Sequence, residues 1–243
     1  MLRRREIDGT HYLAFAELER SLHFTHAITT RQLADDPSDP EAEPLRFAAR
    51  LGVPRDRLVL LRQVHGSETV VCSDDNAGAA PGARPQADGA ILLSSGLFAA
   101  IRTADCVPVI AQLPRHRAAA LFHSGWRGTC ARVVERGLRR LLEQTGAEAS
   151  ELIVAIGPAI RSCCYDVGEE VLRDFERAGH PVRELLDGRR LDLPRSVQLQ
   201  AREVGASNIL DSGLCTVCRN ELFYSYRKEK TPLRTWTIAG WSR

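Results

Sequence analysis

The sequence lacks long hydrophobic runs, an export signal and a strong net charge. Its longest apolar stretches, such as residues 96–101 and 152–156, are far shorter than the roughly 20 residues that a membrane helix needs. No apolar segment follows the arginines near the start, so a secretory signal is not expected, and we expect a cytoplasmic protein with no membrane partner. A net charge of +2 gives no field that favours nucleic acid as a partner.

The composition is that of an ordinary globular protein. The chain has 243 residues, of which 44% are hydrophobic and 26% are charged. These values exclude intrinsic disorder and a small disulfide-stapled domain. No internal repeat or linker divides the chain, so we expect one domain over residues 1–243.

Short apolar runs bounded by Gly, Pro or Asp indicate strands in the middle of the chain, and helical periodicity appears later. Several strands follow one another without an intervening helix. This order predicts an α/β fold in which helices pack on a mixed sheet, rather than a doubly wound parallel sheet. The expected strands are residues 58–64, 69–72, 89–93, 97–102, 107–113, 118–123 and 151–156, the expected helices are residues 129–145, 167–178 and 195–204, and the expected surface loops are residues 35–44 and 76–86.

Three short segments place a metal-binding side chain at the end of an expected strand. His65, Cys106 and His123 lie beside glycine or turn-forming residues. Two imidazoles and one thiolate suit zinc, and three protein ligands leave a fourth position for a catalytic water. The spacing matches no known metal motif, so packed core residues remain an alternative at this point.

A set of longer motifs resembles the YfiH-like family, which is also called the multicopper polyphenol oxidase or laccase-domain family and includes relatives with a peptidoglycan-editing role. The resemblance implies an α+β sandwich with a mixed sheet, a single zinc ion held by His65, Cys106 and His123, and purine nucleoside phosphorylase activity with accompanying adenosine deamination. Copper in place of zinc is the other metal that the ligand set allows. The motifs are RQVHGSETV, ADGAILLSSGLFAAIRTADCVPVIA, ALFHSGWRGTCARVVE, AIGPAIRSCCYDVGEEV and LFYSYRK.

The chain departs from the family pattern after Arg31. The family arginine at this place helps to hold phosphate, and a glycine-rich stretch normally follows it. Here Gln32 and Leu33 lead into an unrelated segment. We expect this change to affect substrate affinity.

Phosphorolysis needs an anion held beside the anomeric carbon, and guanidinium groups suit that task. Arg31, Arg127 and Arg227 are the candidates, and Arg127 lies just before the expected helix at residues 129–145, whose N-terminus also favours an anion. A surface salt bridge is the alternative for each arginine. Tyr165 belongs to the CCY motif and is expected in the substrate pocket.

Deamination needs a group that moves protons, and Asp105 and Asp88 are the nearest carboxylates. Asp105 points away from Cys106 if the strand is extended, and a turn would bring it back. For Asp88, the role of a turn residue before a strand is at least as well supported as a catalytic role. The aromatic residues Phe223, Tyr224 and Tyr226 offer a stacking face for a purine or belong to the core.

The seven cysteines are an odd number, so some thiols are expected to be free. The adjacent Cys163 and Cys164 are interpreted as pocket-lining. Cys215 and Cys218 form an isolated CxxC, which we interpret as structural because the sequence shows no second ligand pair beside it. Cys72 and Cys130 carry no functional signal.

Three other functions compete with the phosphorylase. A multicopper oxidase is disfavoured because it needs about ten imidazoles, partly as His-X-His pairs, and the chain has seven histidines and no such pair. Cys106 and His123 as nucleophile and base would instead make a metal-free hydrolase. The changed segment after Arg31 leaves open a zinc-binding domain without catalysis. The sequence does not assign an oligomeric state.

Overall fold

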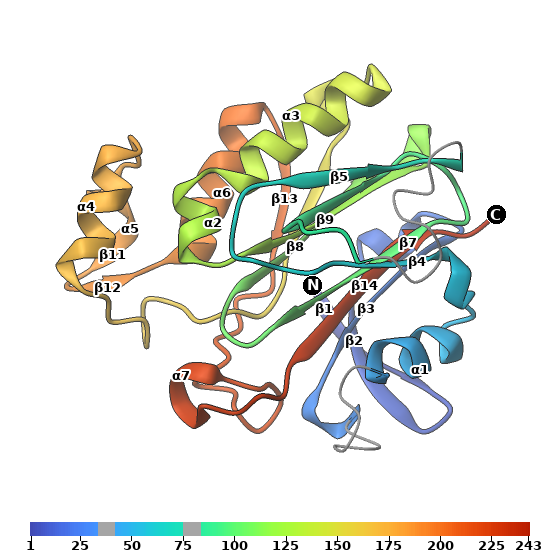
Figure 1. Cartoon of the computed structure of the whole chain (residues 1–243), viewed down its shortest axis with the longest axis horizontal. Coiled ribbons are helices and arrows are strands. Elements are labelled where there is room, and N and C mark those ends of the chain that lie inside the picture. The colour runs from blue at the N-terminus through green and yellow to red at the C-terminus, as the bar shows by residue number, and fades with distance from the viewer. Residues whose placement is uncertain (34–41, 75–83) are drawn as a thin grey trace.

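Two six-stranded sheets form the centre of the computed structural model, which describes residues 1–33, 42–74 and 84–243 (Figure 1). In the first sheet β4 runs parallel to β7, and the other neighbours are antiparallel. Its strands, in spatial order, are β1 (Leu2–Ile7), β2 (Thr10–Phe15), β3 (Phe24–Thr29), β14 (Thr235–Trp241), β7 (Phe98–Thr103) and β4 (Leu58–Leu60).

The second sheet is also mixed, since its two outer pairs are parallel and its inner pairs are antiparallel. The prediction of a mixed sheet with packed helices is therefore confirmed, with two such sheets in the sandwich. The strands of this sheet, in spatial order, are β13 (Asn208–Asp211), β10 (Ile153–Ile156), β8 (Val107–Leu113), β9 (Ala118–Ser124), β6 (Gly89–Leu92) and β5 (Thr69–Cys72). A small third sheet pairs β11 (Leu186–Asp187) with β12 (Arg190–Leu191).

Alternating side chains of the central strands build the layers. In β9, Ala119 and Leu121 enter the core between the two sheets, whereas Ala120 and Phe122 enter the core beneath the helices. The helices α3 (Val133–Thr145) and α6 (Leu193–Val204) cover that outer face, and α1 (Glu43–Arg50) packs on the outer face of the first sheet (Figure 1). The result is a sandwich of two sheets between helices.

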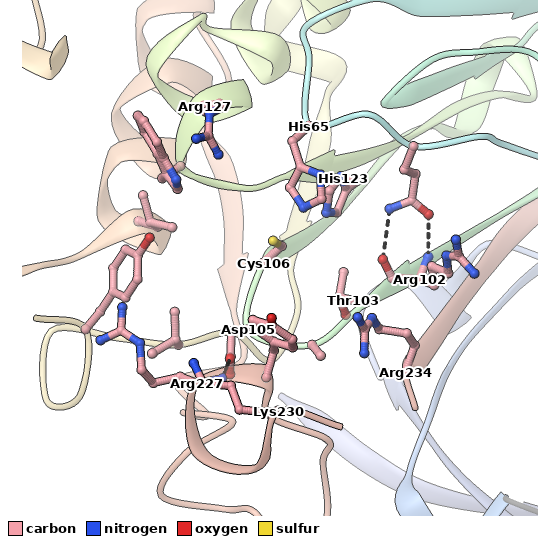
Figure 2. A pocket seen from close by; sticks show the side chains of 17 residues that line it. His65, Arg102, Thr103, Asp105, Cys106, His123, Arg127, Arg227, Lys230 and Arg234 are labelled. Atoms are coloured by element: carbon pink, nitrogen blue, oxygen red, sulfur yellow. Dashed lines mark hydrogen bonds between the residues drawn. The ribbon is translucent and has the colours of Figure 1, made fainter. Parts of the chain in front are cut away.

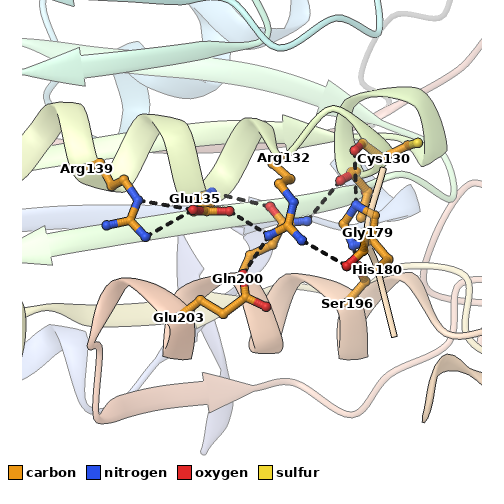
Figure 3. Close-up of polar contacts among 10 residues, drawn as sticks. Cys130, Arg132, Glu135, Arg139, Gly179, His180, Ser196, Gln200 and Glu203 are labelled. Atoms are coloured by element: carbon orange, nitrogen blue, oxygen red, sulfur yellow. Dashed lines mark hydrogen bonds and ion pairs between the residues drawn. The ribbon is translucent and has the colours of Figure 1, made fainter. Parts of the chain in front are cut away.

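The helix expected at residues 129–145 is two helices, so that prediction is wrong in its extent. The chain forms α2 (Trp126–Cys130) and then α3, and Arg132 between them has a left-handed φ of 58°. The Arg132 guanidinium pairs with Glu135 and Glu203, and the Gln200 side chain of α6 donates to the Thr129 carbonyl (Figure 3). These tertiary contacts hold the break, which the helical periodicity alone does not reveal. Gly146 ends α3, also with a left-handed φ.

Other boundaries shift by a few residues. The strand expected at residues 58–64 ends at Leu60, the helix expected at 167–178 is α4 (Glu169–Arg177), and α6 begins earlier than expected because Asp192 caps it. The sequence analysis did not foresee the first three strands or α1. The remaining helices are α5 (Val182–Leu185) and α7 (Tyr226–Glu229), with short 3₁₀ turns η1 (Leu18–Arg20), η2 (Arg31–Leu33), η3 (Arg55–Arg57), η5 (Pro114–His116) and η6 (Ala149–Glu151).

The two expected loops lie largely on residues outside the described ranges. Residues 35–41 and 76–83 belong to the parts not described, whereas Pro44 lies in α1 and Gln86 forms a bridge with Arg62. Within the described ranges, no helix combines the length and the apolar character needed to cross a bilayer.

Candidate functional site

His65, Cys106 and His123, which we call the His/Cys trio, meet where strands of both sheets end (Figure 2). His123 lies near the end of β9, Cys106 directly precedes the adjacent β8, and His65 lies in the turn between β4 and β5. One donor atom from each residue lies within 4.8 Å of the others, and the two imidazole rings meet edge to face with 4.8 Å between centroids. The three motifs thus converge in the fold, although His65 and His123 are 58 positions apart in the sequence.

Asp88 holds two members of the trio in place. Its carboxylate is fully buried and lies 2.8 Å from Nδ1 of His123. It also accepts hydrogen bonds from the backbone N–H groups of Val64, His65 and Gly66. Burial opposes ionisation, but the bonds from His123 and these backbone groups lower the pKa of Asp88. The carboxylate therefore directs Nε2 of His123 toward the site and fixes the His65 turn, a role beyond that of a simple turn residue.

The trio itself is electrostatically coupled. Burial opposes ionisation of Cys106, yet the imidazoles of His123 and His65 lower the pKa of its thiol to about 6. Burial would lower the pKa of His123, but the sulfur of Cys106 and the carboxylate of Asp88 raise it to about 9. The arrangement favours a thiolate beside imidazole groups, which is the state that binds a soft cation.

Local backbone geometry opens the space for a ligand at the trio. A Cβ atom on Gly125 would lie 3.0 Å from both Sγ of Cys106 and Cδ2 of His65. His65 adopts φ of 59°, a conformation that non-glycine residues rarely take and that is held here by the Asp88 bonds. The donor set and the glycine cradle fit a single metal ion with an open fourth position.

A cavity of about 430 Å³ extends from the trio. Trp126, Ile160, Leu193 and Tyr226 give it apolar and aromatic walls. Among the described residues that line it, Asp105 is the one carboxylate, whereas the cations form a majority of the charged groups. The lining cations are Arg102, Arg127, Arg227, Lys230 and Arg234.

Two of the three predicted arginines line this cavity. The guanidinium of Arg127 stacks at 4.3 Å over Trp126, and that of Arg227 stacks at 5.0 Å over Tyr165 (Figure 2). Tyr165 lines the cavity as expected, and burial, followed by the nearby Cys106, raises the pKa of its hydroxyl to about 12. Arg127 is the second residue of the five-residue α2, and the long helix α3 begins only at Val133, so Arg127 does not lie at the start of a long helix as expected.

Arg31 is not brought into the cavity. Its guanidinium lies 2.6 Å from the Glu229 carboxylate of α7 and stacks over Tyr224 at 4.8 Å. It therefore anchors α7, and both Arg227 within this helix and Lys230 directly after it line the cavity. The changed segment after it lies in part outside the described residues.

Asp105 reaches the cavity because the chain turns there, with φ of 87°. Both carboxylate oxygens are engaged. One accepts from the Thr216 hydroxyl at 2.6 Å and the other from the backbone N–H of Arg227 at 2.6 Å. This carboxylate joins three separate loops around the cavity.

The other candidates divide between cavity and core. Phe223 and Tyr224 are buried, whereas Tyr226 lines the cavity and is half exposed. Sequence reasoning did not identify three of the cavity cations. Arg102 lies within the motif that also contains Cys106, and Lys230 and Arg234 follow the LFYSYRK motif.

The cysteine interpretation needs correction. Cys163 and Cys164 do not line the cavity, and the CxxC of Cys215 and Cys218 is not isolated, because the fold places the two pairs together. The chain brings them together from positions more than 50 residues apart, which spacing along the sequence does not show.

Comparisons with known proteins agree with this architecture. Residues 21–240 match the model of the family described as multi-copper polyphenol oxidoreductase laccase. Purine nucleoside phosphorylase YlmD of Geobacillus stearothermophilus is 33% identical over 228 residues, covering 89% of this chain and 80% of that protein. Adenosine deaminase RL5, from an unknown prokaryotic organism, is 30% identical over 200 residues, covering 76% of this chain and 74% of that protein. The crystal structure of YlmD from G. stearothermophilus superposes with a TM-score of 0.80 at 25% identity and 99% coverage of both chains.

Proposed function

The chain belongs to the multi-copper polyphenol oxidoreductase laccase family, and from this premise we propose that it is a zinc-dependent purine nucleoside phosphorylase with accompanying adenosine deaminase activity. The observation that carries the proposal is the opening of a cation-lined cavity directly onto the His/Cys trio. A nucleoside and phosphate are the substrates that this combination suits.

The cavity cations support phosphate binding. Arg127 of α2 and Arg227 of α7 both line it, and each guanidinium lies over an aromatic ring. Guanidinium groups meet phosphate oxygens with paired hydrogen bonds and remain charged at every physiological pH. A volume of about 430 Å³ falls within the usual range of roughly 300–1,000 Å³ for small-molecule sites. In the proposed reaction a phosphate oxygen bonds to the anomeric carbon as the bond to the base nitrogen breaks, which releases the free base and ribose 1-phosphate.

His65, Cys106 and His123 would hold the zinc ion. A zinc ion held there would supply Lewis-acid chemistry. Asp88 keeps His123 in the tautomer that offers Nε2 to the site. Asp105, which the sequence analysis placed among the catalytic residues, acts in this proposal as a positioning residue that fixes Arg227 and Thr216. Arg31 likewise acts through Glu229.

The test is chromatography of adenosine and of inosine incubated with the zinc-loaded protein, with and without phosphate. We expect adenine and hypoxanthine that require phosphate, and inosine from adenosine as the sign of deamination. A Cys106→Ala variant should form neither product, whereas the matched Cys130→Ala variant, altered outside the cavity, should form both. No free base from the zinc-loaded wild-type protein would contradict the proposal and leave a binding domain without catalysis.

One observation favours a second function, that of a cysteine hydrolase. Cys106, His123 and Asp88 are arranged as nucleophile, base and orienting carboxylate, with 2.8 Å between Asp88 and Nδ1 of His123. A metal-bound thiolate is not free to attack, so the two functions exclude each other. Iodoacetamide labelling of Cys106 that zinc does not slow would favour the hydrolase, and protection by zinc would exclude it.

The oxidase function suggested by the family's description has less support. Among the described residues, the His/Cys trio is the possible metal-binding group that contains histidine. Its three side chains would hold one ion and not the several coppers of a multicopper oxidase. Copper analysis of the copper-loaded chain is expected to give no more than one histidine-bound ion.

A further inference from the structure

Four cysteine side chains from two separate loops meet at the surface. Cys163 and Cys164 lie in a turn after β10, and Cys215 and Cys218 lie between β13 and α7. Their sulfur atoms all lie within 4.8 Å of one another. Cys215 is buried, Cys164 is partly buried, and Cys163 and Cys218 are exposed. We call this group the four-cysteine cluster.

We propose that the four-cysteine cluster is a second metal site, a tetrahedral one that binds a single thiophilic divalent cation and suits Zn²⁺. Four thiolates arranged as a closed tetrahedron are typical of structural zinc sites. This site does not depend on the activity proposed for the cavity.

The sulfur separations fit a shared cation. Sγ of Cys218 lies 3.6 Å from that of Cys163 and 3.5 Å from that of Cys164. Ligands at a Zn–S distance of about 2.3 Å form a tetrahedron with edges of roughly 3.8 Å. A disulfide needs about 2.05 Å between two sulfurs, which is much shorter than these two separations.

The backbone around Cys215 is arranged to stabilise a thiolate. Backbone N–H groups of Cys218, Arg161 and Val217 hydrogen-bond to the sulfur of Cys215. Two of these donors lie two and three residues after Cys215, within the same CxxC turn. Such a turn wraps its amides around the sulfur of its first cysteine.

The two loops are already held together before any cation binds. Ala159 and Cys215 form a parallel bridge, and Arg161 makes a bidentate ion pair with Asp211 at 2.8 and 2.7 Å. The ligands are therefore preorganised, which reduces the ordering that binding requires.

The cation would clamp two loops that border the cavity. Tyr165 directly follows Cys164 and lines the cavity, and Thr216 directly follows Cys215 and donates to Asp105. Loss of the cation is expected to lower stability and to disturb substrate binding only through these neighbours.

The first test counts Zn²⁺ in four proteins after loading and removal of free metal. We expect two ions per chain in the wild type, one in Cys106→Ser, one in Cys163→Ser/Cys218→Ser, and two in the control Cys130→Ser. The ion that remains in Cys106→Ser should disappear when the two cluster substitutions are added. The zinc count of the four-cysteine cluster does not depend on the phosphorylase proposal, so we expect the same count for the cluster if that proposal fails. Equal zinc content in the wild type and in Cys163→Ser/Cys218→Ser would overturn the second site.

A second measurement needs no variant that might unfold. In the wild-type chain, Zn²⁺ should protect the exposed Cys163 and Cys218 from a maleimide until a chelator is added. Equal labelling with and without Zn²⁺ would contradict the proposal. A mass two hydrogens below that of the fully reduced chain, located to this cluster, would show a disulfide instead.

Discussion

The two cysteine-containing groups of this fold differ in donors, burial and surroundings. The His/Cys trio offers one sulfur and two imidazoles, includes the buried His123, and opens onto a cation-lined cavity. The four-cysteine cluster offers four sulfurs from surface loops and lies outside the lining of that cavity. An open set of three ligands suits chemistry, whereas a closed set of four suits structure.

The supporting contacts differ in the same sense. Asp88 orients His123 from behind, as carboxylates do for metal-bound histidines at reactive sites. The cluster instead has backbone amides around Cys215 and an Arg161–Asp211 ion pair between its loops. Both groups are built from neighbours that fix ligands, and of the two it is the trio that lines the cavity.

Replacement of Cys106 by alanine should produce the largest effect. Loss of the sulfur removes a ligand and several kcal/mol of transition-state stabilisation, so we expect phosphorolysis to fall by roughly a thousandfold or more. The measurement is kcat/KM for inosine under saturating phosphate. Cys218→Ser should lose less than about tenfold in the same assay, because its site is structural. Equal losses in the two variants would break the comparison.

Replacement of Asp88 by asparagine should have the next largest effect. The amide oxygen can still accept from the backbone N–H groups of Val64 and Gly66. The amide NH₂ group, however, can no longer accept from the His65 N–H or from Nδ1–H of His123. We expect zinc affinity at the trio to weaken by roughly 10–100-fold, with the zinc of the four-cysteine cluster unchanged. Competition with a chelator in a Cys163→Ser/Cys218→Ser background measures the trio alone. Unchanged affinity there would show that Asp88 serves folding only.

Replacement of Arg127 by glutamine should weaken phosphate binding in the cavity and leave both metal sites intact. Loss of a charge-assisted contact of about 1.5–3 kcal/mol should raise KM for phosphate by roughly 10–100-fold with little change in zinc content. Arg117→Gln is a matched control, because Arg117 also stacks over a tryptophan, Trp241 at 5.9 Å, but lies outside the cavity. A similar rise of the KM for phosphate in both variants would mean that Arg127 acts through the net charge of the protein and not through contact with phosphate.

A pH effect of smaller size comes from His26, far from both groups. Its Nε2 accepts the Phe15 N–H at 2.8 Å, and burial lowers the pKa of His26 to about 4. In the unfolded chain His26 binds a proton near pH 6.5. The folded chain therefore keeps its full free energy of unfolding above that pH and loses up to about 3 kcal/mol of it as the pH falls toward 4. Urea unfolding at pH 7 and pH 5 should show the loss, and His26→Gln should reduce it. An equal loss of unfolding free energy between pH 7 and pH 5 in the wild type and in His26→Gln would contradict this assignment. A confirmed loss sets the lowest pH at which the two metal sites should be compared.

Local sequence patterns predicted much of the central fold. The short apolar runs of β8 and β9, the glycine that ends α3 and the mixed order of strands and helices all appear in short windows. The break at Arg132 did not, because contacts with Glu203 and Gln200 from a distant helix decide it.

The site was foreseen unevenly for the same reason. His65, Cys106, His123, Arg127, Arg227 and Tyr165 all carry motif signals, and all line the cavity. Arg31 matches a motif but is drawn away by Glu229 and Tyr224, which neighbour it only in the folded chain. The pairing of the two cysteine loops depends on the parallel bridge between Ala159 and Cys215, a contact that no local pattern encodes.

The most direct test of the account is the product balance of zinc-loaded protein acting on inosine and phosphate, with Cys106→Ala beside it. The account predicts one ribose 1-phosphate for each hypoxanthine released by the wild type and neither product from the variant. Hypoxanthine accompanied by free ribose, or equal product from the Cys106→Ala protein, would contradict phosphorolysis at the His/Cys trio.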